Sequence, residues 1–435
     1  YDFPLGTTIV TMDAVDANGL AAEQASFTVT VIDDIAPAPA AEVSFVVNPD
    51  GSITVSGVAE NGSTVSVTFP DGTTVRQILN SFGNAKTVAA AVPFSITSKG
   101  SQPAGQAAVV VTDPAGNQSA EAKVEIAATV DLAEVHENIS GFLQSRASHV
   151  VRAQPDLIGH LSGTRGGKFN ANVTKDEGSF EFASPAGQPV WAQLEGSWST
   201  VGALENSYFM GAAGAHYVIN PNALVGVMFE FDRLTQTNGG TTTEGTGYLI
   251  GPYFVAKLPD QPLFIEGRYL IGKTQNTVDM DGAFNDTFET DRKLASVKVA
   301  GQLHYGKVTL TPHLMATQLS DTQAAFTDDF DRLIAAQGIT VTDVAASLDF
   351  STPIAVPNVA FPLTGGGSGL WSQTTVTGAA ADDIAVSGGG RARVKLGGSY
   401  VTDNGVTFSA DAYYDGIGAD DYESWGVSVG VNVNF

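Results

Sequence analysis

The sequence predicts an all-β protein with two kinds of β-structure joined by one helix. Glycine accounts for 48 of the 435 residues and charged residues for only 15%, a composition typical of β-rich chains with many turns. Short runs of alternating polar and apolar residues occupy residues 1–128, and longer alternating runs occupy residues 188–435. Alternation with period two indicates strands that bury one face. We therefore expect β-sandwich repeats, a helix and a large antiparallel barrel, in that order.

The N-terminal strands belong to a repeat. Residues 1–35 and 105–126 each contain two alternating runs around a turn that begins with aspartate, Asp16 in the first and Asp113 in the second. The two aspartates are 97 residues apart, which is the length of one immunoglobulin-like sandwich domain. We therefore expect the end of one repeat, a linker stiffened by prolines and a complete repeat, at residues 1–35, 36–40 and 41–128. A first repeat that is cut favours a longer parent protein, and removal of a signal peptide is the alternative.

A change of period after residue 130 predicts the helix. Asp131 is a suitable N-cap with Glu134 three residues later, and Pro155 limits the other end. A helix of about 20 residues is roughly 30 Å long. One face of this helix carries the apolar residues Leu132, Val135, Ile139, Phe142, Leu143 and Val150.

The C-terminal runs favour a barrel that spans a membrane. Most of them have nine or more residues, and a tilted strand needs about 9–11 to cross a bilayer, whereas strands of soluble sandwiches average about 5–6. All four Trp and ten of the eleven Tyr follow residue 187, as expected for aromatic belts at two membrane interfaces. A large soluble β-sandwich or a β-solenoid is the alternative.

Spacing sets the expected number of strands. At roughly 20 residues per strand and loop, residues 188–435 have room for twelve strands, an even number as outer-membrane barrels require. The first strand, near residues 190–198, is expected to pair with the last, because an open edge in lipid would leave backbone groups unpaired. Residues 162–187 are expected to be an irregular connector.

The inner face of these strands is predicted to be polar. Charges of both signs fall on the positions that alternate with apolar residues, which suits a wet lumen. The residues predicted to face the lumen are Glu195, Glu230, Asp232, Glu266, Arg268, Arg391, Arg393, Lys395 and Asp411. Residues 131–161, comprising the helix and a linker, are predicted to thread this lumen, because a helix with a mixed surface can exchange water for contacts with polar walls.

Composition excludes several classes of function. The net charge of −25, with 13 acidic against 4 basic residues up to residue 130 and 33 against 17 after it, opposes binding to nucleic acid. The absence of cysteine removes thiol chemistry and disulfides. The six histidines have no metal-ligand spacing, and no catalytic motif occurs, so we predict neither an enzyme nor a cofactor. Asp33 and Asp34, at the repeat junction, are weak candidates for calcium.

Several segments resemble the translocator domain of autotransporters, the β-barrel of type V secretion. They are residues 139–146 (ISGFLQSR), 154–157 (QPDL), 190–198 (VWAQLEGSW), 211–217 (GAAGAHY), 247–253 (GYLIGPY), 264–268 (FIEGR), 390–394 (GRARV), 414–416 (YDG) and 422–435 (YESWGVSVGVNVNF). The opening, through residues 3–8, 15–19 and 27–31, is similar to hyaline (HYR) repeats without their cysteines.

The resemblance implies a twelve-stranded outer-membrane barrel in Gram-negative bacteria, whose helix carries an N-terminal passenger to the cell surface. It implies contact with outer-membrane lipids and with the barrel assembly machinery, which would read the terminal strand through Trp425, Val427, Val429, Val431, Val433 and Phe435. Asn138 lacks the paired-asparagine context of self-cleaving linkers, so a passenger that stays attached is expected. Display of the repeats for adhesion to an unknown target, or for surface architecture, is the favoured function. A simple pore or structural barrel is the alternative.

Overall fold

The computed structural model describes the whole chain except residues 1, 5, 80–90, 163–166, 175, 186–187, 202, 357–358, 380, 382–387, 403–405, 420–423 and 434–435. The chain forms two compact units, Tyr1–Leu132 and Ala133–Phe435. Each unit is described below by itself.

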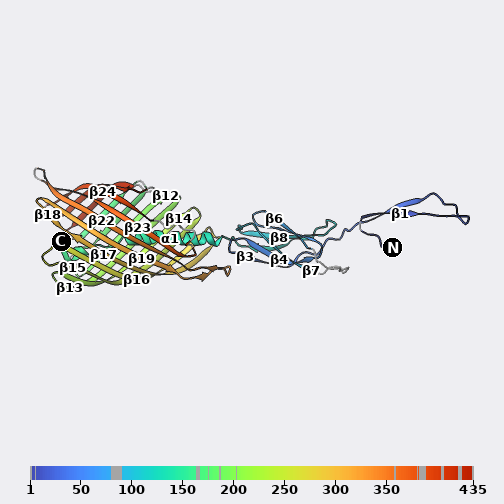
Figure 1. The fold of residues 1–435 in the computed structure, drawn as a ribbon, viewed down its shortest axis with the longest axis horizontal. Coiled ribbons are helices and arrows are strands. Elements are labelled where there is room, and N and C mark those ends of the chain that lie inside the picture. The colour runs from blue at the N-terminus through green and yellow to red at the C-terminus, as the bar shows by residue number, and fades with distance from the viewer. Residues whose placement is uncertain are drawn as a thin grey trace. The chain divides into compact units, whose positions relative to one another are not determined.

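The N-terminal unit contains a β-sandwich with one apolar core. One sheet has the order β3-β4-β7 and the other the order β6-β5-β8-β9 (Figure 1). The core between them includes Ile53, Val65, Phe94 and Val109, all less than 4% exposed. The strands are β3 (Ala41–Val47), β4 (Ile53–Glu60), β5 (Thr64–Thr68), β6 (Thr74–Ile78), β7 (Ala91–Thr97), β8 (Gly105–Thr112) and β9 (Ala122–Ile126).

Two turns of the sandwich are closed by their own aspartates. The Asp50 carboxylate accepts bonds from the hydroxyl and the amide of Ser52 at 2.6 and 3.0 Å. The Asp71 carboxylate accepts the equivalent pair from Thr73 at 2.6 and 2.8 Å. These hydrogen bonds lower the pKa of both carboxyl groups, so both turns favour the ionised form.

The strands β1 (Gly6–Met12) and β2 (Ala25–Val31) form a separate two-stranded sheet whose turn copies that of β8–β9. In the first turn the Asp16 carboxylate accepts a bond from the amide of Leu20 at 3.0 Å, and in the second Asp113 accepts one from Asn117 at 2.8 Å. Gly19 and Gly116 occupy the same place in the two turns with φ of 81° and 98°, a conformation that favours glycine. The two turns therefore share the same aspartate hydrogen bond and the same glycine conformation.

The C-terminal unit is a closed antiparallel barrel. Fourteen strands of the described chain form the ring, which runs from β10 through β17 to β19, on through β22 to β26, and back to β10. The strands are β10 (Gly167–Val173), β11 (Glu177–Ala183), β12 (Val190–Val201), β13 (Leu204–Asn220), β14 (Ala223–Asn238), β15 (Thr241–Lys257), β16 (Leu263–Met280), β17 (Asn285–Gly301), β19 (Val308–Gln323), β22 (Gln337–Val356), β23 (Val359–Gly378), β24 (Gly388–Val401), β25 (Val406–Ile417) and β26 (Ser424–Val433). Short strands β18 (Leu303–Tyr305), β20 (Phe326–Thr327) and β21 (Leu333–Ile334) lie in connections.

The predictions of twelve strands and of an irregular connector over 162–187 are wrong. That segment supplies β10 and β11, and β26 closes the barrel on β10 rather than on residues 190–198. The two strands have only seven residues each, which is why their alternation of Phe169 and Ala171 with polar neighbours was too short to stand out. Without them β12 and β26 would each have an open edge in lipid.

The predicted all-β fold with a lumen helix is confirmed. Phe229 on the outer wall is 44% exposed, while its neighbour Met228, on the inner face, is 1% exposed. The helix expected over 131–152 is α1 (Leu132–Arg152), and a short helix, α2 (Ile158–Ser162), follows it. Among the described residues, none of the helices is both long and apolar enough for a membrane span.

Candidate functional site: the barrel lumen and its helix

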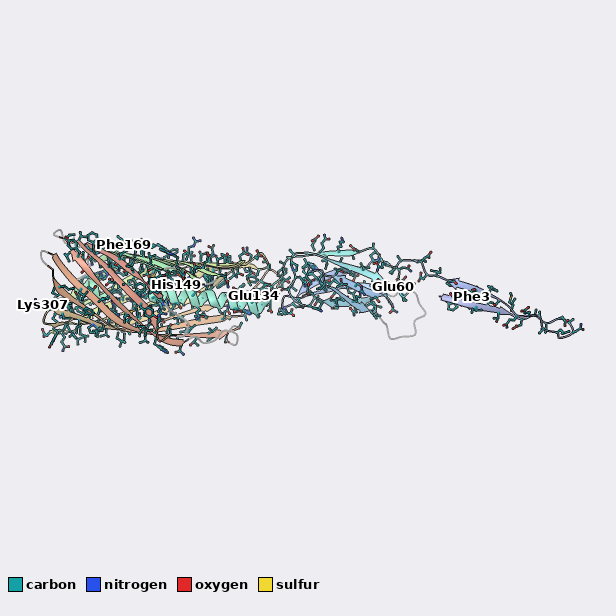
Figure 2. The ribbon with its side chains drawn as sticks, turned by 90° about the horizontal axis from the view of Figure 1, so that it is seen from above. Phe3, Glu60, Glu134, His149, Phe169 and Lys307 are labelled. Atoms are coloured by element: carbon teal, nitrogen blue, oxygen red, sulfur yellow. The ribbon has the colours of Figure 1, made fainter. Side chains whose placement is uncertain are left out.

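Helix α1 lies within the barrel (Figure 2) and buries both apolar and polar side chains. The six apolar residues predicted for one face, Leu132, Val135, Ile139, Phe142, Leu143 and Val150, are all buried. Ser140 and Arg146 are 0% exposed as well. Polar groups of a helix that are buried inside a barrel need partners, and the strands supply them.

Arg146 is the centre of a buried ion network. Its Nε donates to Asp232 Oδ2 and its Nη1 to Asn276 Oδ1, each at 2.6 Å. Arg292 donates to the second Asp232 oxygen and to Asp321 Oδ2, each at 2.7 Å. Two arginines and two aspartates balance their charges across β14, β17, β19 and α1. Since a buried charge is tolerated only when it is paired and hydrogen-bonded, the network fixes the position of the helix.

A second polar cluster holds the chain where α1 ends. Gln154 Nε2 donates to Glu230 at 3.1 Å, while Arg268 donates to the Pro155 carbonyl and to Glu266, each at 2.6 Å. The other Glu266 oxygen accepts bonds from the amides of Leu157 and Ile158 at 2.8 and 2.9 Å. A carboxylate at this position satisfies amides at the start of α2 that have no partner within the helix.

Further contacts of α1 reach strands on both sides of the lumen. His149 stacks on Tyr208 with ring centroids 4.7 Å apart. Toward the start of α1, Ser140 donates to Gln337 at 2.9 Å, and the His136 ring accepts a bond from the Ala335 amide at 3.2 Å. Hydrogen bonds therefore connect α1 and the chain just after it to the barrel wall, from the loop before β22 to β16.

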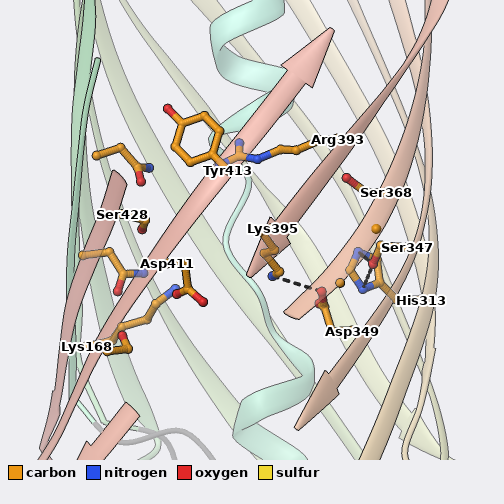
Figure 3. Close-up of a pocket in the computed structure, with 15 residues that line it drawn as sticks. Lys168, His313, Ser347, Asp349, Ser368, Arg393, Lys395, Asp411, Tyr413 and Ser428 are labelled. Atoms are coloured by element: carbon orange, nitrogen blue, oxygen red, sulfur yellow. Dashed lines mark hydrogen bonds and ion pairs between the residues drawn. The ribbon is translucent and has the colours of Figure 1, made fainter. Parts of the chain in front are cut away.

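The opposite side of the lumen is open. A cavity of about 480 Å³ lies against β10, β19 and β22–β26 (Figure 3). Lys395 pairs with Asp349 at 3.0 Å, and the guanidinium of Arg393 lies 3.6 Å from the centre of the Tyr413 ring. A second cavity of about 360 Å³ shares Asn172, Arg393 and Tyr413 with the first and includes His149 of α1. The shared lining makes the two cavities neighbours along one polar path.

The nine residues predicted to face the lumen fall into two groups. Glu230, Asp232, Glu266 and Arg268 contact the segment of α1 and α2. Glu195, Arg391, Arg393, Lys395 and Asp411 line the open cavities. Sequence reasoning missed Arg146, Arg292 and Asp321 as partners. An arginine midway along a helix expected inside a barrel was the available signal, because it requires an acidic partner on the wall.

The residues predicted as the assembly signal are described in part. Trp425, Val427 and Val429 are exposed on the outer face of β26, and Val431 is half-buried. The strand ends at Val433, and Phe435 lies outside the described residues.

The fold and the lumen together define a class of protein. Every described strand of the ring has two hydrogen-bonded neighbours, so the barrel has no open edge. Its outer face presents Val227, Phe229, Ile250, Ile271 and Leu314, each 44–56% exposed. An apolar wall around a polar lumen is the form in which β-structure spans the outer membrane. The protein is an outer-membrane β-barrel with an occupied lumen.

Comparisons with known proteins concern each unit separately. Residues 38–128 match the family model described as a bacterial Ig domain. Over 70% of its length the chain is similar to the translocator domain of autotransporter NalP from Neisseria meningitidis (14% identity, 99% of that chain, TM-score 0.44). It is also similar to the beta domain of the Bordetella autotransporter Brka (13%, 62% and 100%, 0.40) and to the transport unit of autotransporter AIDA-I from Escherichia coli (14%, 67% and 98%, 0.35). No curated protein matches the sequence significantly.

Proposed function

We propose that this chain is an outer-membrane translocator that anchors its N-terminal Ig-like unit and displays it at the bacterial surface, without catalysis. The observation that carries the proposal is that α1 lies in the lumen and is hydrogen-bonded to the barrel wall, where Arg146 binds Asp232 and Asn276. The chain that precedes this helix is the Ig-like unit. A helix held in this way links a displayed segment to a membrane anchor.

The alternative, a simple pore with incidental repeats, is less well supported. A pore needs a free lumen, whereas α1 and the barrel share a balanced ion network and a second cluster at Glu266. Burying the charged groups of both clusters costs desolvation free energy. A conducting channel would not need these clusters. Retention of the helix is what an anchor requires.

Surface display is tested by the accessibility of short epitope tags in intact cells. The full chain is expressed behind a secretory signal peptide with a tag at Ala115 in the Ig-like unit, at Gly239 in the β14–β15 turn, or at Gly306 in the turn at the other end of the barrel. We expect antibody to bind the first two tags in intact cells and the third only after permeabilisation. A tag at Ala115 that stays hidden while Gly239 is accessible would contradict display.

The role of the displayed unit is proposed to be adhesion or surface architecture. Cells carrying the full chain should adhere to a surface or to one another more than cells carrying a chain without residues 1–130. The matched control is the Phe229→Arg variant described below, which retains the unit and weakens the anchor. Equal adhesion by the full and shortened chains would restrict the function to anchoring.

The terminal strand is proposed to be read by the barrel assembly machinery. We expect removal of Phe435 alone to lower the amount of folded outer-membrane protein several-fold at unchanged synthesis. Heat-modifiable gel mobility of membrane fractions measures the folded amount. In a protein without such a signal, removal of the last residue would leave the folded amount unchanged, since chain ends usually fray.

A further inference from the structure

Three basic side chains project from one sector of the outer wall of the barrel. Arg233 on β14 and Lys273 on β16 have side chains 55% and 58% exposed, and Lys293 on β17 is exposed. Their neighbours in sequence, such as Asp232 and Arg292, are buried on the inner face. The strand alternation therefore directs these three cations away from the lumen and toward the lipid side.

The three cations share one level on the wall. Each is the first polar residue beyond the apolar band on its strand: Arg233 follows Phe231, Lys273 follows Ile271, and Lys293 precedes Ala295 and Val297. The strand register supports a common level. Arg233 pairs directly with Thr246, whereas Tyr248 pairs with Lys273 and Ile271 with Lys293, so the band edge moves by two residues at each of the last two steps from β14 to β17. Strands that tilt relative to the barrel axis require such a shift.

Charge at this level is confined to the one sector. On the flanking strands the residue at the same edge is Ser207 on β13, Gln318 on β19 and Thr342 on β22, and between the cations it is Thr246 on β15. Acidic residues lie farther from the band: Glu244 pairs with Arg233 at 2.9 Å, and Asp291 approaches Lys273 at 3.6 Å. Lys293 has no ion-pair partner among the described residues. In this sector the cations therefore lie next to the apolar band, and the acidic residues lie farther from it.

The level of the cations lies toward the start of α1. Arg146 of α1 contacts Asp232, next to Arg233, whereas Leu157 contacts Glu266, seven residues before Lys273 on β16. Moving back along the chain from Leu157 to Arg146 therefore leads toward the band edge with the three cations. If the Ig-like unit is displayed as proposed above, this edge lies in the outer leaflet.

We propose that Arg233, Lys273 and Lys293 bind the phosphate groups of a multiply phosphorylated, acylated glycolipid of the outer leaflet, of the lipopolysaccharide type. Cations at a bilayer interface attract lipid phosphates, and charge-assisted bonds from guanidinium and ammonium groups to phosphate are strong. Lys273 and Lys293 are diagonal neighbours on adjacent strands, about 7–8 Å apart, so one headgroup can reach both. Tyr248 and Ile271 beside them offer apolar contact for the acyl chains. The choice of leaflet rests on the proposed function.

The test uses the full chain folded in detergent and titrated with bis-phosphorylated lipid A. Bound lipid is counted by native mass spectrometry, and gel mobility verifies folding. We expect the Arg233→Gln/Lys273→Gln/Lys293→Gln variant to bind about ten-fold or more weakly than the native chain. The Lys307→Gln variant, which loses an exposed cation at the other end of the barrel, should bind normally. These substitutions lie on the surface and leave the core intact.

Two further arms identify the ligand. Lipid A without phosphates should bind no better than a zwitterionic phospholipid, and inorganic phosphate at equal concentration should not displace lipid A. Equal binding of lipid A by the folded triple variant, equal binding of the dephosphorylated lipid, or displacement by inorganic phosphate would each overturn the proposal. Tag accessibility is measured separately, so a failure of surface display would be recognised independently of lipid binding.

Discussion

The two sides of the lumen differ in what fills them. The side formed by β13–β17 and β19 packs against α1 through buried leucines and methionines, and its charges are paired with the helix or with one another. The side formed by β10, β11 and β22–β26 keeps open cavities, where Arg391 pairs with Asp415 and Lys395 with Asp349. The barrel thus packs against the helix on one side of the lumen and leaves space for water on the other.

A barrel of this width can hold a helix without being filled by it. A ring of fourteen strands is wider than one helix needs, because diameter grows with strand number. Concentrating the contacts on one side gives α1 a dry, specific interface where ion pairs are strong. The remaining space stays polar, so it costs little to keep hydrated. The contacts that hold the helix and the open polar space therefore lie mainly on different strands.

Removal of the helix should abolish the difference between the two sides of the lumen. Of the changes considered, it should alter the protein most. A chain without residues 131–160 loses Arg146 and the whole packed interface, so water and ions gain the full lumen. We expect its single-channel conductance in planar bilayers to rise several-fold above that of the full chain. An unchanged conductance would mean that α1 does not occupy the lumen in the membrane.

Breaking the ion network should weaken the packed side far more than an equivalent change weakens the open side. Asp232→Asn removes the negative charge that Arg146 and Arg292 share. We expect a loss of about 3–5 kcal/mol in the free energy of unfolding. Asp411→Asn on the open side, where the carboxylate accepts a bond from Thr364 at 3.0 Å, should cost less than about 1 kcal/mol. Urea unfolding from phospholipid vesicles measures both. Equal losses would remove the distinction between the sides.

The wall of the packed side separates lipid from lumen, and two adjacent residues test it. Phe229→Arg places a charge in the apolar band and should cost roughly 2–4 kcal/mol. Glu230→Gln should be mild, because an amide oxygen can still accept the bond that Gln154 donates at 3.1 Å. The same vesicle unfolding experiment compares the two variants. Similar costs at both positions would contradict the assignment of faces.

The sequence predicted the structure correctly where a run of alternating or helically spaced residues is long. It failed where the run is short, and where a contact depends on the register between strands. The alternation over residues 223–232 already separates Phe229 from Glu230, and the apolar spacing of α1 identifies its buried residues. The seven-residue strands β10 and β11 were missed because two or three alternations do not exceed chance. The pairing of Arg292 with Asp321 depends on which residues face each other across β17 and β19, and this is fixed only when the ring closes.

The smallest expected effect concerns the ion path along the open side. Arg393 borders both cavities and lies over the Tyr413 ring, and it forms no ion pair with the described residues. Arg393→Gln should therefore change the free energy of unfolding by less than about 1 kcal/mol. It removes a positive charge from the narrow polar space that ions must use while α1 is in place. We therefore expect the full chain with Arg393→Gln to become more selective for cations, seen as a shifted reversal potential in a potassium chloride gradient. Lys307→Gln, in a turn outside the lumen, is the control and should leave the potential unchanged. If the folded Arg393→Gln protein kept the native reversal potential, ions would have to pass elsewhere, and the open side would be a hydrated filling rather than a path.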